Sequence, residues 1–114
     1  MSYFLNWQKF SVENATLDFY KFSENGVNFI GFDSTKSVPP EPMINALTAL
    51  NLVKDSSVKV VMINHKFPAG LIPKVEPFFD IDTQNLDDGA VKLTFSLKPN
   101  ADLSNFNAND TCHG

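Results

Sequence analysis

Apolar residues along this chain follow helical spacing in one segment and strand-like spacing in several others. Between Glu41 and Lys54 they recur every three or four positions, which predicts a helix with one apolar face. The segment from Val58 to Ile63 is β-branched and nearly continuously apolar, as in a central strand that is buried on both faces; a strand with one buried face is the alternative. Val91 to Leu97 alternates strictly between apolar and polar residues, which predicts a strand with one buried face.

The N-terminal part predicts a hairpin preceded by an aromatic extension. An aromatic-rich run from Thr16 to Phe22 is separated from Val27 to Asp33 by Asn25-Gly26, a strong hairpin signal. The aromatic residues of 1–15, among them Trp7 and Phe10, fit neither period. We expect them to pack on the open side of the sheet; the alternative is an exposed patch for a partner or a second copy, which would make the protein a homodimer.

The C-terminal part predicts a short helix, a second hairpin and a tail. Prolines make the helix between Pro68 and Pro77 short and irregular, and it should turn its apolar residues inward, namely Leu71, Ile72, Val75 and Phe78 or Phe79. A strand from Ile81 to Leu86 should then turn at 87–89 and pair with the last strand. After Pro99 the composition becomes polar, which indicates a mobile tail.

This order of elements predicts a two-layer α/β sandwich, an α+β arrangement in which two helices cover one face of a mixed sheet. Residues 1–26 would form the aromatic extension and an added hairpin strand. Residues 27–98 would form the βαβαββ domain, and 99–114 the polar tail.

Composition limits the classes of partner. The chain has 114 residues, of which 43% are hydrophobic and eleven are Phe, enough for one folded domain. Its net charge is −4, with nine scattered basic residues against thirteen acidic ones, so we expect no nucleic-acid partner. No leader or membrane span is visible and there is one cysteine, which predicts a cytoplasmic protein without a membrane partner.

The segment Ser37-Val38-Pro39-Pro40-Glu41-Pro42-Met43 contains three prolines within four residues. Such crowding is tolerated where backbone N–H groups lack helical partners, at the start of a helix. Glu41 would there complement the helix dipole.

Residues 27–98 resemble the domain-of-unknown-function family 2249, which is related to the TusA-type (SirA-like) sulfur carriers. The matching pieces are Phe32-Asp33, Pro39-Pro40-Glu41-Pro42-Met43 and Asn64-His65-Lys66-Phe67-Pro68, with Leu71 and Pro73 beyond. The resemblance implies the βαβαββ fold and a site at the proline-rich helix start. It also implies a setting in respiratory or redox metabolism.

The chain departs from these carriers at the residue that performs their chemistry. A reactive cysteine stands in their Cys-Pro-x-Pro motif at the start of the first helix, where the helix dipole lowers a thiol pKa. The matching position here is Pro39, which has no nucleophile. The resemblance therefore implies the fold and the location of the site without the carrier reaction.

The candidate site lies in the loops that follow two predicted parallel strands. Both loops would leave the same edge of the sheet, where α/β proteins commonly bind ligands. A small polar or anionic ligand would meet side chains from both loops, namely Ser34, Ser37, Asn64, His65 and Lys66. In the alternative reading, Ser37 caps the helix and the others are solvated loop residues.

His65 would need a carboxylate partner to act as an acid, a base or a metal ligand, and the nearest candidates are Asp33 and Glu41. The alternative is a structural or surface histidine. Cys112, beside His113, could serve a redox or sulfur-handling role, or belong to an unstructured end.

No catalytic motif is present, so the sequence predicts a non-enzymatic binding module without a cofactor. Its partner would be an unidentified protein or a small polar ligand. A sulfur-handling or redox accessory protein that uses Cys112 is the alternative.

Overall fold

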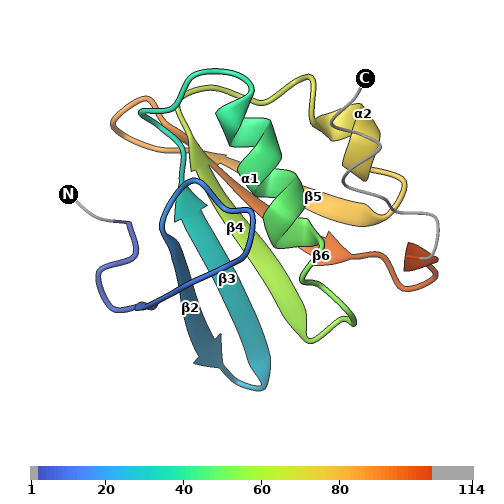
Figure 1. Cartoon of the computed structure of the whole chain (residues 1–114). Coiled ribbons are helices and arrows are strands. Elements are labelled where there is room, and N and C mark those ends of the chain that lie inside the picture. The colour runs from blue at the N-terminus through green and yellow to red at the C-terminus, as the bar shows by residue number, and fades with distance from the viewer. Residues whose placement is uncertain (1–2, 104–114) are drawn as a thin grey trace.

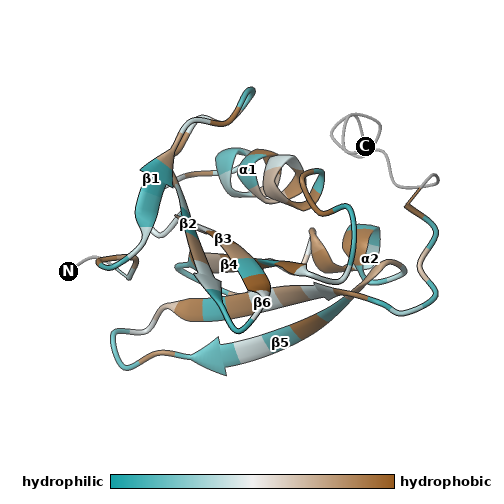
Figure 2. Cartoon of the chain, turned by 90° about the horizontal axis from the view of Figure 1, so that it is seen from below, coloured by the Kyte–Doolittle hydropathy of each residue, from teal (hydrophilic) through white to brown (hydrophobic). Residues whose placement is uncertain are grey.

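The computed structural model describes residues 3–103 as one six-stranded mixed sheet with two helices on one side of it (Figures 1 and 2). The sheet order is β1-β2-β3-β4-β6-β5; β3 and β4 are parallel, and every other neighbouring pair is antiparallel. The predicted two-layer sandwich and its βαβαββ element order are confirmed. In chain order the elements are β1 (Gln8–Phe10), β2 (Phe19–Glu24), β3 (Val27–Asp33), α1 (Glu41–Leu50), β4 (Val58–Asn64), α2 (Ile72–Val75), β5 (Phe79–Asn85) and β6 (Val91–Leu97).

The main core lies between α1 and the sheet. Leu47 and Leu50 of α1 are fully buried, and so are Phe32, Met62 and Phe95 from the strands they cover. Along β4, alternate residues belong to this core and to a second cluster on the opposite face. The prediction that this strand is buried on both sides is confirmed.

The opposite face of the sheet is covered at one end by the N-terminal turn. Phe4 is buried and stacks on Tyr20 with ring centroids 5.3 Å apart, while Trp7 stacks on Phe22 at 5.6 Å. Leu5 remains exposed. The expectation that the N-terminal aromatic residues pack on the open side of the sheet is confirmed for Phe4 and Trp7. It is wrong for Phe10, which packs against the main core with its ring centroid 6.4 Å from that of Phe19.

Both predicted hairpins form. Asn25 and Gly26 adopt positive φ angles of 53° and 81°, as a two-residue turn between antiparallel strands requires. The first of these strands is Phe19–Glu24 rather than Thr16–Phe22, because the backbone at 16–17 bonds to α1 instead of to the sheet. The second hairpin begins earlier than predicted, at Phe79.

Both helices are shorter than their apolar patterns suggested. α1 ends at Leu50 rather than Lys54, because the N–H groups of Leu52 and Val53 bond three residues back in tight turns. Val53 is buried all the same. α2 is a single turn, consistent with the prolines around it.

Leu103 packs against the main core, and the remainder of the predicted tail lies outside the described residues. Within residues 3–103, no helix combines the length and apolar character needed to cross a bilayer.

Candidate functional site

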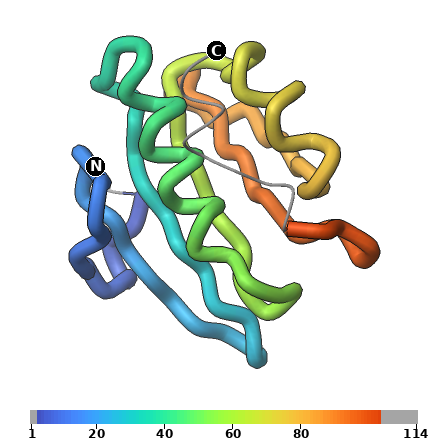
Figure 3. Tube along the Cα trace, turned by 45° about the vertical axis from the view of Figure 1, so that its right-hand side comes forward, coloured from blue at the N-terminus to red at the C-terminus, as the bar shows by residue number. Residues whose placement is uncertain are grey.

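Parallel pairing brings the two predicted site segments to one edge of the sheet. Asp33, the last residue of β3, lies opposite Ile63 of β4, so the segments 34–40 and 65–71 leave the sheet on the same side. Their traces run close together at that edge in Figures 1 and 3. The predicted proximity of the proline-rich segment and the histidine-bearing segment is present.

Between these segments lies a groove of about 400 Å³, which we call the proline groove. The Met43 side chain comes close to Gly70, because a Cβ atom at Gly70 would lie 3.6 Å from Met43 Cε. Most of the lining is apolar, whereas the sequence suggested a polar cleft. Its residues are Pro39, Pro40, Pro42 and Met43 from the first segment and Asn64, His65, Lys66, Phe67, Pro68, Ala69, Gly70 and Leu71 from the second.

Ser34 and Asn64 join the two segments from beneath. The Ser34 hydroxyl lies 2.8 Å from Asn64 Oδ1 and 3.0 Å from the carbonyl oxygen of Ile63, so its one proton is shared between two acceptors. Asn64 Nδ2 donates to the carbonyl oxygen of Lys66 at 2.9 Å. Both side chains are buried, so they hold the two segments together and are not solvated loop residues.

Ser37 does not cap α1, contrary to the alternative reading. The N-cap residue is Pro40, and α1 has no side-chain cap hydrogen bond at its start. The Ser37 hydroxyl instead donates to Glu41, whose carboxylate also accepts from Thr16 Oγ1 at 2.6 Å. These hydrogen bonds, with that from Thr16 the stronger, lower the pKa of Glu41 below its usual 4.5.

His65 is not brought against either carboxylate proposed as its partner. The Asp33 carboxylate accepts from the backbone N–H and hydroxyl of Thr35, at 2.9 and 2.7 Å, and Glu41 is held by Ser37 and Thr16. His65 and Lys66 are exposed at the rim of the proline groove. Among residues 3–103, no three His, Cys, Asp or Glu side chains gather as metal ligands.

A second, smaller hollow lies on the other side of His65, and no pattern in the sequence indicates it. It measures about 220 Å³ and is lined by Tyr3, Thr35, His65, Asp88, Gly89 and Ala90. The Tyr3 hydroxyl donates to the Asp88 carboxylate across it. That bond, followed by desolvation and by the negative charges of Asp88 and Asp33, raises the pKa of Tyr3 to about 12. The same bond, followed by the one from the Ala90 backbone N–H, lowers the pKa of Asp88. Eighty-five positions separate these residues, so sequence spacing carries no signal of the contact.

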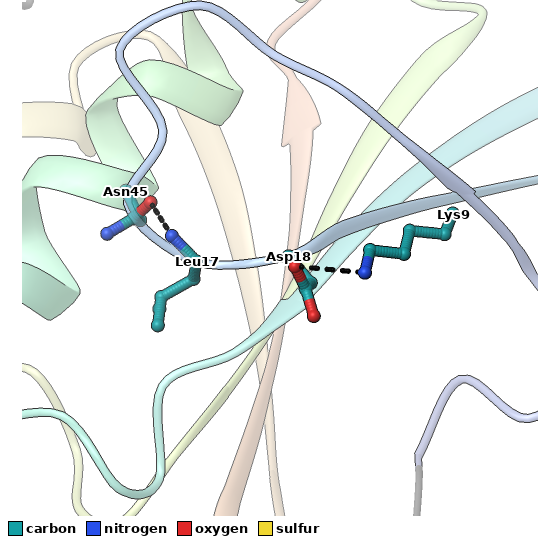
Figure 4. A network of polar contacts seen from close by, with 4 residues as sticks. All are labelled: Lys9, Leu17, Asp18 and Asn45. Carbon is teal, nitrogen blue, oxygen red and sulfur yellow. Dashed lines mark hydrogen bonds and ion pairs between the residues drawn. The ribbon is translucent and has the colours of Figure 1, made fainter.

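Sequence reasoning also missed Asn45, which anchors the chain before β2 to α1 (Figure 4). Its Oδ1 accepts from the backbone N–H groups of Thr16 and Leu17 at 2.9 and 3.2 Å. Its Nδ2 donates to Thr16 Oγ1 and to the carbonyl oxygen of Glu41. The sequence feature that could have indicated this role is the position of the Asn45 amide beside Ala46, within the apolar face of the predicted helix.

The possible redox residue Cys112 lies outside the described part of the chain.

No family model, curated protein or solved structure matches this chain. The resemblance to the domain-of-unknown-function family 2249 and to the sulfur carriers therefore stays a prediction.

Proposed function

We propose that this protein is a non-enzymatic binding module. The proline groove holds the apolar part of a protein partner or small ligand, and an anionic group of that molecule faces His65 and Lys66. The observation that carries this proposal is the apolar lining of the groove with a basic residue exposed at its rim.

The lining favours binding because it loses little freedom when a ligand arrives. Pro39, Pro40 and Pro42 have no side-chain rotamer entropy to lose, and Ser34 and Asn64 fix the opposite segment from below. Pockets of this kind take most of their affinity from apolar contact and their orientation from a few polar groups.

Lys66 supplies the polar selectivity. The one ion pair within residues 3–103 joins Lys9 to Asp18, so no carboxylate of the described chain neutralises the Lys66 ammonium. A carboxylate or phosphate next to an apolar group would meet the ammonium while its apolar part contacts the prolines. This combination makes the prediction from the sequence more specific: the small ligand or protein partner carries an anionic group next to an apolar one.

The respiratory or redox setting and the sulfur-handling alternative stay predictions. The first depends on the resemblance alone, and the second depends on Cys112. Neither adds a contact to the proline groove.

The test is a titration of ¹⁵N-labelled protein with phenylacetate, with phenylacetamide as the uncharged match. We expect saturable amide shifts across 64–71 and a preference for the carboxylate of up to about fivefold, the range of one exposed ion pair. Lys66→Ala should remove that preference, whereas Lys54→Ala, an exposed lysine in the loop between α1 and β4, should keep it. Shifts that avoid 64–71, or a preference unchanged in Lys66→Ala, would contradict the proposal.

A further inference from the structure

The outer strand β5 presents backbone groups that no other described strand uses. β5 ends the sheet order and pairs only with β6. The Lys98 N–H donates to the Phe78 carbonyl oxygen at 2.9 Å, and the Leu86 N–H donates to the Ala90 carbonyl oxygen at 2.8 Å. In an antiparallel pair, residues that bond to the neighbouring strand alternate with residues that do not, so these two bonds show which residues of β5 face β6. By that alternation, the N–H and C=O groups of Ile81, Thr83 and Asn85 point away from β6.

The two edges of the sheet differ in how far they could accept another strand. β1 at the opposite edge has three residues, and its Lys9 is paired with Asp18 at 3.4 Å. β5 has seven residues, Phe79-Asp-Ile-Asp-Thr-Gln-Asn85, without a proline, glycine or lysine. Short strands, prolines and charged side chains, lysines above all, are common means of blocking an edge; of these, β5 has only the exposed carboxylates of Asp80 and Asp82.

The two faces of β5 differ in chemistry. On the helix side, a groove of about 280 Å³ lies between α2 and β5; its lining includes the apolar Phe67, Ile72 and Ile81, and Glu76 and Asp80 also border it. On the other face, Asp80 and Asp82 alternate with these positions and are exposed. Neither carboxylate forms an ion pair within residues 3–103. Lys98 also lines the groove and is the one basic residue there.

We propose that β5 accepts an extended segment of a partner protein as a seventh strand, and that this segment alternates apolar with basic side chains. The outward N–H and C=O groups of β5 supply the pairing, as in other cases of strand addition. The partner's apolar side chains enter the groove beside α2, and its lysines or arginines face Asp80 and Asp82. The alternating apolar and basic side chains of the partner match β5 whether the added strand is parallel or antiparallel to it, because residues directly opposite each other lie on the same face of the sheet.

A second copy of the chain fits this edge less well. An antiparallel register centred on Ile81 would place Asp80 opposite Asp82 of the second copy, and a register centred on Asp82 would place the two Asp82 carboxylates opposite each other. Like charges directly opposite each other destabilise a strand pair. In these two registers the acidic face therefore disfavours self-association, whereas a basic segment meets no such repulsion.

Strand addition at β5 does not depend on the proposed function. The groove beside α2 shares Phe67 with the proline groove and otherwise has its own lining. A failure at β5 would leave phenylacetate binding unchanged, and the reverse also holds.

The test uses the peptide acetyl-Thr-Lys-Val-Lys-Ile-Lys-Thr-amide and a matched peptide with glutamate in place of each lysine. Titration of ¹⁵N-labelled protein should shift the amides of Ile81, Thr83 and Asn85, and hydrogen exchange of these amides should slow when the lysine peptide is bound. The glutamate peptide should not bind. Protection of these amides without peptide that rises with protein concentration would indicate self-pairing, and would overturn the proposal.

Thr83→Pro removes one outward N–H while the ladder bonds to β6 remain, and proline is tolerated on the open side of an edge strand. It should abolish peptide binding, whereas Thr83→Val should retain it. Should Thr83→Pro fail to fold, the exposed pair Asp80→Lys and Asp82→Lys carries the test, with an expected loss of at least about fivefold in affinity at low salt. Unchanged affinity in that double variant would overturn the proposal.

Discussion

The Ser34 hydroxyl lies 2.8 Å from Oδ1 of Asn64, and this buried contact joins the two segments that form the proline groove. Ser34→Ala would leave the Asn64 oxygen buried without its donor. We expect a loss of about 2 kcal/mol in the free energy of unfolding, measured by urea denaturation. Ser56→Ala, at an exposed serine, is the control and should change little. Equal stability of the two variants would show that the Ser34–Asn64 hydrogen bond does not form.

The ring of Phe4 occupies the space above Gly31, where a Cβ atom would lie 2.8 Å from both Phe4 Cζ and Trp7 Cζ3. Gly31→Ala should therefore displace the N-terminal turn, at a cost of about 2 kcal/mol. Phe4→Ala should cost about 3 kcal/mol through the cavity it leaves.

The double variant distinguishes this contact from two separate defects. The methyl group introduced by Gly31→Ala would fill part of the space left by Phe4, so the two single losses should sum to more than the loss in the double variant. Trp7, the one tryptophan of the chain, reports unfolding by fluorescence. Strict additivity would mean that Phe4 and Gly31 do not touch.

Asn45 holds the chain before β2 through three hydrogen bonds, and a fourth goes to the carbonyl oxygen of Glu41 in its own helix. Asn45→Ala would remove these bonds and leave two backbone N–H groups without their acceptor, with an expected loss of about 3 kcal/mol. Asn51→Ala, at the exposed C-cap of the same helix, should be close to neutral. Thermal and urea denaturation of the pair would check this; comparable stability would contradict the role given to Asn45.

The Tyr3–Asp88 hydrogen bond should make stability depend on pH at both extremes. The raised pKa of Tyr3 means that its contribution is complete below pH 10.0 and is lost as the pH rises towards about 12. The lowered pKa of Asp88 means that its contribution is present above pH 3.8 and is lost as the pH falls below that value. The stability difference between wild type and Tyr3→Phe should thus be largest between these limits. A difference that stays constant up to pH 12 would contradict this contact.

Local patterns were sufficient for most elements of the fold. The hairpin turn at Asn25-Gly26, the buried strand β4 and the alternation of β6 each depend on neighbours in sequence, so periodicity and turn chemistry predicted them. The ends of α1 and α2 were set by backbone hydrogen bonds that an apolar pattern does not specify. Val53 shows this, since it is buried at helical spacing yet lies beyond the helix.

The candidate site was predicted in location more than in detail. Parallel pairing of β3 and β4 was sufficient to bring Pro39 and His65 to one groove. The roles of Ser34, Ser37 and Asn64 depend on which atoms meet across that edge, which spacing along the chain does not reveal. The Tyr3–Asp88 and Asn45–Thr16 contacts join distant segments and were missed for the same reason.

Met43 reports most directly on the central claim that the proline groove is a binding site. In protein labelled with ¹³C in its methionine methyl groups, the Met43 methyl should show a nuclear Overhauser effect to Gly70, and should shift saturably on addition of phenylacetate. Met62, which is fully buried in the main core, should keep its position. A Met43 signal without that contact, or one that stays unmoved at saturating phenylacetate, would contradict the account.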